Sequence, residues 1–206
     1  MKIRWLIVLV VILVVFSYLS TNFTALNPKL GLWSSAGQNN VTAQSVTMQG
    51  LENPVNVTLD ASGVAHIHAG NFHDLFFAQG YYSASQRLFQ MELEGLLASG
   101  NLSKYIGAQG VNSDKAMRLI GLPSNAWALE QAYQANYPTY YSYLQDYVQG
   151  VNAYINNTPS QSVSLGFKLL GIQPYQWSVF YSLCWQEYMA WSLTTGAAEP
   201  LQSALL

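Results

Sequence analysis

The feature that most constrains the fold is a block at residues 57–107, in which a short alternating segment runs into a long segment with helical periodicity. Just before and within it, Val55, Val57 and Leu59 alternate with polar residues, which is the pattern of a strand with one buried face. Residues 60–63 indicate a turn, and residues 64–68 continue beyond it. The block therefore predicts a strand pair, or one bent strand, followed by a helix.

The predicted helix shows apolar residues at intervals of four and three, so that they lie along one face. These residues are Phe77, Tyr81, Ala84, Leu88 and Met91. Gly80 and Gly95 interrupt the same segment, and glycine lowers helix propensity. We therefore expect each of these glycines to permit close contact with a neighbouring element.

A second helical pattern covers residues 127–155, and Ser124 is its expected N-cap. Pro138 lies inside this pattern, which predicts two helices, or one kinked helix, meeting near Tyr137. Phe167 to Leu170, with Gly171 and Pro174, predict a turn before an aromatic segment at residues 177–193. Strands followed by several helices predict an α+β fold that is mostly helical.

The composition limits the kinds of partner and site. Half of the 206 residues are apolar, which suits one domain with a sizeable core. Only 9% are charged and the net charge is −2, so no basic patch could neutralise several phosphates, and nucleic acid is excluded as a partner. The single cysteine, Cys184, excludes an internal disulfide and a multi-cysteine zinc site, and it predicts a buried thiol.

The N-terminus has the features of a targeting segment. Lys2 and Arg4 precede an apolar run at residues 5–19, and this run is short for a bilayer span, which needs roughly 20 residues. Residues 1–19 therefore predict either an uncleaved signal anchor in the membrane or a cleaved signal peptide. Residues 20–45 predict a polar linker, and residues 46–206 the folded domain. Positive charge at the start predicts that the rest is extracellular or at the cell surface.

Several polar residues allow more than one interpretation. Five Asn-x-Ser/Thr triplets are compatible with a glycosylated exterior. His66 and His68 share one strand face, but no further ligand follows at a recognisable spacing, so a metal site there is disfavoured.

Arg87 could be paired and partly buried, or solvated on a helix face. Aromatic residues near the end predict core packing or, alternatively, an acyl pocket; they are Trp177, Tyr181, Trp185, Tyr188 and Trp191.

Four motifs occur in one order along the chain. The first is Asp60-x-x-Gly-Val-x-His-Ile-x-Ala, and the second is Gly80-Tyr-x-x-Ala-x-x-Arg-Leu-Phe-Gln-Met-Glu, followed by Gly100-x-Leu and Gly107. The third is Gly150-Val-Asn-Ala-Tyr-Ile, and the fourth is Phe167 with Gly171-x-x-Pro-x-x-Trp. In this order and spacing they resemble the α-subunit of penicillin acylases, which are N-terminal nucleophile hydrolases. The family usually has proline where Ala65 stands.

The resemblance implies a precursor that is cut into an α- and a β-subunit, which together form a four-layer αββα sandwich. The β-subunit begins with the nucleophilic serine, whose own α-amino group acts as general base. Ser124-Asn-Ala-Trp imitates this signature, but it follows Pro123 and lies upstream of the third and fourth motifs. We therefore expect no catalytic residue in this chain, which alone would be inactive.

The resemblance also assigns site residues. Residues 189–199 are similar to the segment that lines the acyl pocket, which implies that Met189, Ser192 and Leu193 face the acyl group. Glu199 would bind structural calcium together with β-subunit oxygens. Penicillin G-specific members carry arginine and phenylalanine where Ser192 and Leu193 stand, so the acyl preference stays open.

Two functions from different classes follow from these expectations. The first is the α-subunit region of an exported amidohydrolase that cleaves a linear carboxamide in a β-lactam side chain, an acyl-homoserine lactone or another N-acyl compound. Its partners would be a β-subunit, an N-acyl substrate and the membrane through residues 5–19. The second is a non-catalytic, membrane-anchored surface module that reuses the same fold for binding or structure.

Overall fold

The computed structural model describes residues 9–12, 14–15, 49–60, 62–159 and 162–194. The chain divides into two compact units. The larger unit comprises Val41–Asn157 and Pro174–Leu206, and the smaller comprises Met1–Asn40 and Thr158–Gln173. The predicted linker and domain boundaries at residues 20–45 and 46–206 fall mainly on residues that are not described, and they stay predictions.

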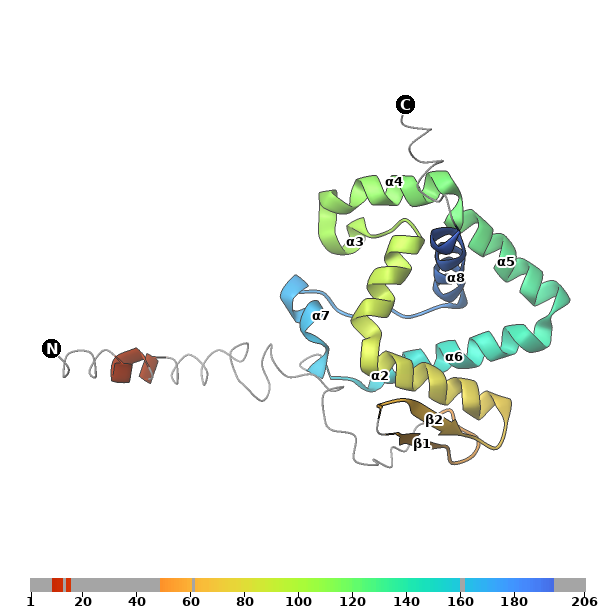
Figure 1. Ribbon diagram of the computed structural model, residues 1–206, viewed down its shortest axis with the longest axis horizontal. Coiled ribbons are helices and arrows are strands. Elements are labelled where there is room, and N and C mark those ends of the chain that lie inside the picture. The colour runs from red at the N-terminus through yellow and green to blue at the C-terminus, as the bar shows by residue number, and fades with distance from the viewer. Residues whose placement is uncertain (1–8, 13, 16–48, 61, 160–161, 195–206) are drawn as a thin grey trace. The chain divides into compact units, whose positions relative to one another are not determined.

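The larger unit opens with a two-stranded hairpin (Figure 1). Strands β1 (Asn56–Leu59) and β2 (Ala65–His68) pair antiparallel, with Asn56 opposite His68 and Leu59 opposite Ala65. Gly63 has φ 79° in the turn, and Asp60 closes the turn by accepting from the Val64 N–H at 2.9 Å. The prediction of a strand pair is confirmed, and the turn residues fix its register.

Helix α2 (Phe72–Ala98) is the predicted amphipathic helix. Its N-cap Asn71 accepts a hydrogen bond from the Asp74 N–H, and Phe77, Ala84 and Leu88 are buried as the periodicity predicts. At Arg87 the backbone leaves helical geometry, with φ −140° and ψ 23°, so two helical segments meet there at a kink. Arg87 itself is exposed and donates to Gln90, which agrees with the interpretation of a solvated residue.

Short helical elements follow α2, and the sequence did not predict them. These are α3 (Ser103–Ile106), a 3₁₀ turn (Gly107–Gly110) and α4 (Val111–Ile120). Buried Asp114 accepts from the N–H groups of Leu102 and Ser103 at 2.6 and 3.1 Å, and so satisfies the free donors at the start of α3.

Two longer helices then form the predicted pair. Helix α5 (Leu122–Asn136) and helix α6 (Pro138–Asn157) meet at Tyr137, which confirms the break expected from Pro138. The prediction of Ser124 as N-cap is wrong, because the helix begins at Leu122. Gly121, with φ 90°, ends α4 and also precedes the first turn of α5.

The main core of the larger unit lies where α2, α5, α6 and α8 (Val179–Leu193) pack together. Its buried members are Ala98, Ala126, Val179, Leu183 and Cys184. The thiol is free and fully buried, as predicted, and burial together with the charges of Glu130 and Glu187 raises the pKa of Cys184 to about 12. The prediction of a mostly helical α+β fold is confirmed.

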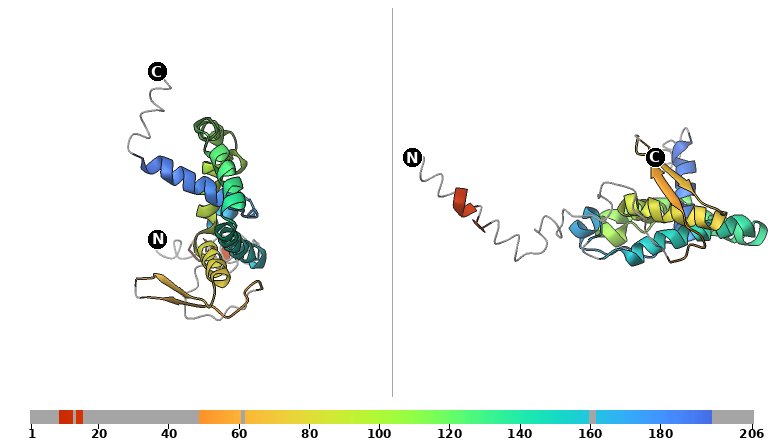
Figure 2. Two further views of the ribbon diagram at one scale, coloured as in Figure 1. Left: turned by 90° about the vertical axis from the view of Figure 1, so that its right-hand side faces the viewer. Right: turned by 90° about the horizontal axis from the view of Figure 1, so that it is seen from below.

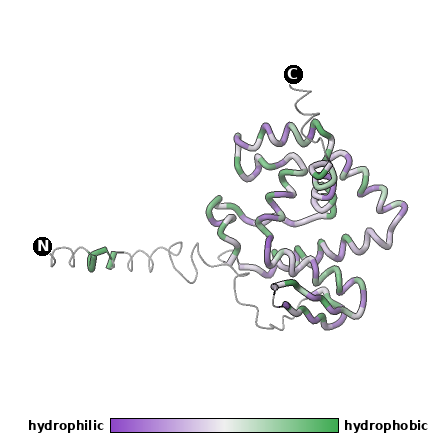
Figure 3. Tube along the Cα trace, in the orientation of Figure 1, coloured by the Kyte–Doolittle hydropathy of each residue, from purple (hydrophilic) through white to green (hydrophobic). Residues whose placement is uncertain are grey.

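In the smaller unit, helix α7 (Leu165–Leu170) stands where the sequence predicted only a turn. Gly171 ends it in the left-handed conformation, φ 66°. Figure 3 shows the described residues of the N-terminal apolar run as hydrophobic. Within the described ranges, no helix has the length and apolarity that a bilayer span requires. Residues 5–19, predicted from the sequence as a membrane segment, lie mostly outside these ranges.

Candidate functional site

The residues expected to face an acyl group lie at the C-terminal end of α8. The first half of this helix is held in the core by Val179, Leu183 and Cys184. Its second half projects away from α4 and α5 (Figure 2, left). Met189 is 39% exposed and Leu193 is 73% exposed. An apolar helix end is therefore left without cover from the described part of the chain.

Met189, Ser192 and Leu193 are spaced three and four residues apart, so the helix brings them to one face. The Ser192 hydroxyl donates to the Met189 carbonyl at 3.2 Å, which turns it toward its own helix. The face is thus mainly apolar. Glu199, the expected calcium ligand, lies outside the described residues.

An aromatic row runs along α8 beside this face. The ring centroids of Trp185 and Tyr188 lie 5.2 Å apart, and those of Tyr188 and Trp191 lie 5.9 Å apart. Trp185 and Tyr188 also pack against the core cluster, whereas Trp177 is almost completely buried. The core-packing interpretation is confirmed for Trp177, and the row lies on the part of α8 that carries Met189.

The turn before α8 is fixed by one amide side chain of α6. Asn152 accepts from the Trp177 N–H at 2.7 Å and donates to the Trp177 carbonyl at 3.0 Å. The two bonds set the position from which α8 starts. Asn152 lies in the third sequence motif, but the sequence analysis assigned it no role. An amide side chain between apolar residues was the feature that could have identified it as a hydrogen-bonding residue of the interior.

We expect Asn152→Ala to lower the free energy of unfolding by about 2–4 kcal/mol, because two partly buried backbone groups of Trp177 lose their partners. Asn156→Ala is the matched control. Asn156 makes an exposed side-chain bond to Gln176, so its loss should cost about 0.5 kcal/mol or less. Urea unfolding followed by circular dichroism measures both, and equal effects would contradict the assigned role.

A buried carboxyl group lies under the same turn. Glu92 is fully buried on α2, and its Oε1 accepts from the Tyr175 N–H at 3.1 Å, while Oε2 accepts from the Tyr105 hydroxyl. The Tyr175 hydroxyl donates to the Glu92 carbonyl at 3.2 Å. Burial raises the pKa of Glu92 to about 8 and outweighs these hydrogen bonds. The carboxyl group is thus mostly protonated at neutral pH and joins α2, α3 and the start of the α8 segment.

The three histidines do not converge. His66 lies 3.3 Å from Asp60 in the hairpin, whereas His73 contacts Asp146 on α6. In the part of the chain that the structure describes, no group of three histidine, cysteine, aspartate or glutamate residues is placed to hold a metal ion.

Comparison with known proteins identifies relatives for this arrangement. A family model described as Penicillin amidase matches residues 54–206. An acyl-homoserine lactone acylase QuiP of Pseudomonas fluorescens is 35% identical over 125 residues, covering 59% of this chain and 15% of that protein. Penicillin acylase 2 proenzyme of a Pseudomonas species is 32% identical over 139 residues, covering 68% of this chain and 17% of that protein. The chain thus spans less than a fifth of the length of these curated relatives.

A solved structure shares the fold of this chain. A thermostable penicillin G acylase from Alcaligenes faecalis matches with a TM-score of 0.59 and 23% identity, covering 72% of this chain and 80% of that chain. At this identity the likeness shows the fold alone. The family model, however, takes in β1, β2 and helices α2 to α8, and with them all four sequence motifs. The chain therefore belongs to the penicillin amidase family.

Proposed function

We propose that this chain supplies the α part of an exported amidohydrolase, with a β-subunit that carries the nucleophilic serine at its N-terminus. The observation that carries the proposal is the family match over residues 54–206, combined with the uncovered apolar end of α8. The chain spans 15% and 17% of two relatives, so most of the length of those proteins has no counterpart among these residues.

In this proposal Met189, Ser192 and Leu193 form one wall of an acyl pocket. The wall is apolar and exposed on α8, so it gains free energy when an acyl tail and a second subunit cover it, at about 25 cal/mol per Å² of apolar surface. Such a wall selects for an apolar acyl group and leaves the amide to groups on the β-subunit. The substrate class is a linear N-acyl compound, including β-lactam side chains and acyl-homoserine lactones.

The proposal includes a structural calcium ion shared between subunits. Calcium takes six to eight oxygen ligands, and Glu199 could contribute at most two of them. The β-subunit would have to supply most of the others. The described residues offer no cluster that would take its place.

Export through the N-terminal segment is the remaining part of the proposal. The apolar run at residues 5–19 and the two basic residues before it support either membrane anchoring or secretion, with the catalytic region outside the cell. The Asn-x-Ser/Thr triplets would then lie where glycosylation can occur.

The test is to express the full chain alone and together with a β-subunit encoded beside it in the same genome. Phenylacetyl amides and acyl-homoserine lactones of increasing chain length serve as substrates. We expect turnover only when both polypeptides are present. Turnover by the chain alone would refute the proposal that the nucleophile lies on the β-subunit. A tight but inactive complex of the two polypeptides would favour the non-catalytic module.

The acyl wall has its own test in the active complex. Leu193→Asp should raise KM for long-chain substrates by about tenfold or more, because a charged group replaces apolar surface that covers the acyl tail. Leu119→Asp is the control, since Leu119 is 84% exposed on α4, a different helix. Equal KM values for the two variants would remove Leu193 from the wall.

A further inference from the structure

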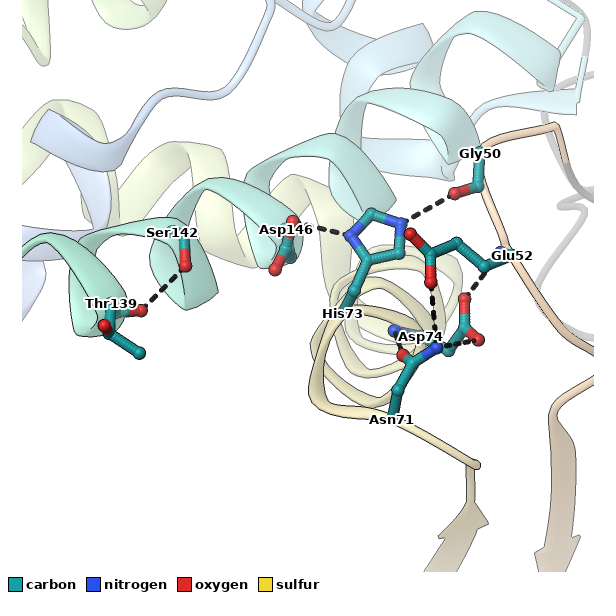
Figure 4. Close-up of polar contacts among 8 residues, drawn as sticks. All are labelled: Gly50, Glu52, Asn71, His73, Asp74, Thr139, Ser142 and Asp146. Atoms are coloured by element: carbon teal, nitrogen blue, oxygen red, sulfur yellow. Dashed lines mark hydrogen bonds and ion pairs between the residues drawn. The ribbon is translucent and has the colours of Figure 1, made fainter.

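His73 lies at the junction between the domain and the chain that enters it (Figure 4). It belongs to the first turn of α2, and its ring stands between α6 and the segment that precedes the hairpin. Nδ1 is 2.7 Å from the Asp146 carboxylate of α6, and Nε2 is 2.8 Å from the Gly50 carbonyl. The side chains of His73 and Asp146 are 27% and 12% exposed. Both contacts are therefore partly protected from water.

Both partners of His73 are acceptors. An ionised carboxylate and a backbone carbonyl have no proton to give, whereas a neutral imidazole carries one N–H and an imidazolium carries two. Only the protonated ring can thus donate to Asp146 and Gly50 at once. The hydrogen bond to the Gly50 carbonyl raises the pKa of His73, burial opposes this, and the bond to Asp146 and the charges of Asp146 and Glu52 raise it further.

The contact at Gly50 is one of several that attach residues 49–53, the entering segment, to the start of α2. Oδ1 of Asp74 accepts from the Glu52 N–H at 2.7 Å, and Oδ2 accepts from the Asn53 N–H at 3.0 Å. The Asn71 amide donates to Glu52 Oε2 at 3.1 Å. Gly50, at φ 115°, leaves no room for a Cβ, which would lie 2.6 Å from the Phe77 ring. The segment is thus seated on the start of α2 by polar contacts and by shape.

We propose that His73 is a pH-operated clasp that fastens residues 49–53 to helices α2 and α6 when its ring carries two protons, and releases them when it carries one. On deprotonation the ring must give up either Asp146 or Gly50. The segment then keeps the Asp74 contacts but loses its link to α6. The clasp closes in acid and opens toward alkaline pH, and this inference does not depend on the proposed enzymatic function.

The acidic groups around the His73 ring determine that the clasp closes at low pH and opens at high pH. Asp146 faces it from α6, Glu52 from the entering segment, and Asp74 lies beside it on α2 (Figure 4). Their negative charges favour the doubly protonated ring, so loss of its proton weakens the contacts on both sides of it. Burial acts to raise the pKa of Asp74, but hydrogen bonds from Glu52 and Asn53 hold it below its usual range.

Opening would have a structural consequence at the predicted linker. Residues 49–53 join that linker to the hairpin, and a loosened segment at this point becomes accessible to proteases. The bond after Glu52 is a natural reporter, because a glutamate-specific protease would cut between the entering chain and the domain. In the closed clasp, both the Glu52 N–H and its carboxylate are engaged.

The test is amide hydrogen exchange of the full chain between pH 5.5 and 9, corrected for the intrinsic pH dependence of exchange. Protection at Glu52 and Asn53 should fall by about tenfold or more as His73 loses its proton, because one charge-assisted hydrogen bond that holds the segment is lost. Protection at Val64, whose N–H is bonded to Asp60 in the hairpin turn, should not follow the same transition. Cleavage after Glu52 should accelerate over the same pH range.

Variants separate a titrating clasp from a merely structural contact. His73→Gln should give weak protection that does not change with pH, whereas His68→Gln, on an exposed face of β2, should keep the transition. Asp146→Asn should move the midpoint to lower pH, because the ring loses a negative partner. A nuclear magnetic resonance titration of the His73 ring gives the same midpoint independently. Unchanged protection through that titration, or an unchanged transition in His73→Gln, would overturn the clasp.

Discussion

Gly150→Ala is expected to be among the most destabilising single substitutions in this chain. This is the reverse of the usual effect, since alanine in a helix interior is normally about 1 kcal/mol more stabilising than glycine. A Cβ at Gly150 of α6 would lie 1.9 Å from the Phe77 carbonyl of α2. The opposing position repeats the geometry, since a Cβ at Gly80 would lie 2.0 Å from the Tyr147 carbonyl. The obstacles are backbone atoms, so no side chain can rotate away. The two helices must separate.

Separation would remove the packing of Phe77 and Val151, which are buried on the two helices beside the crossing. We expect the free energy of unfolding to fall by about 3 kcal/mol or more, at the upper end of the cost of overpacking. Gly70→Ala is the control, because nothing lies within 4 Å of its Cβ position. Urea unfolding followed by circular dichroism measures both variants.

The double variant Gly80→Ala with Gly150→Ala gives a sharper result. Once one methyl group has separated the helices, the second meets less resistance, so the combined loss should be smaller than the sum of the single losses. Additive losses, or a Gly150→Ala protein as stable as wild type, would mean that the helices do not cross backbone to backbone at these glycines.

The crossing also shows what could be predicted from the sequence. The stripe along α2 and the glycine inside it were enough to predict a helix with a close neighbour, because both signals are local. The alternation before Gly63 and the position of Pro138 were equally local, and they predicted the hairpin and the α5–α6 break. Periodicity and backbone restriction carry this information directly.

Elements stabilised by distant partners could not be predicted in the same way. Helix α3 has four residues, and its first N–H groups are satisfied by Asp114, 11 and 12 positions away. The start of α5 was misplaced because Ser124 has the chemistry of an N-cap, while the left-handed Gly121 sets the actual boundary. A serine can cap a helix that starts at any of several nearby residues, so it fixes the helix start only when the conformation of the preceding turn is known.

In the candidate site, too, local features could be predicted from the sequence, whereas features that depend on distant residues could not. The helical spacing of Met189, Ser192 and Leu193 predicts a shared face, and the structure places them on one. Their exposure depends on how α8 packs and could not be read from spacing. The burial of Glu92 was hidden for the same reason, since its partners Tyr105 and Tyr175 lie 13 and 83 positions away.

Glu92→Gln is expected to remove most of a pH dependence that this single carboxyl group imposes on stability. In the unfolded chain the group has its ordinary pKa of 4.5, whereas in the folded protein burial raises the pKa to about 8. Between these values the folded state keeps a proton that the unfolded state has released. The stability contribution is therefore complete below pH 4.5 and is lost as the pH rises toward 8.

Each pH unit in this window should lower the free energy of unfolding by up to about 1.4 kcal/mol, for a total on the order of 5 kcal/mol across the window. Glutamine keeps the shape and can still accept from the Tyr175 N–H, but it has no proton to release. Relative to wild type, Glu92→Gln should thus gain stability as the pH rises from 5 to 8. His73 titrates in both proteins, so its contribution cancels in the difference between them.

Urea unfolding at several pH values gives this difference directly. Glu94→Gln is the control on the same helix, because the Glu94 carboxylate accepts from the exposed Gln90 side chain at 2.8 Å and is not one of the fully buried side chains. Parallel profiles for wild type and Glu92→Gln would show that the carboxyl group is ionised in the folded state. The bonds from Tyr105 and Tyr175 would then stabilise a buried charge, and the junction of α2, α3 and the α8 segment would not weaken as the pH rises from 5 to 8.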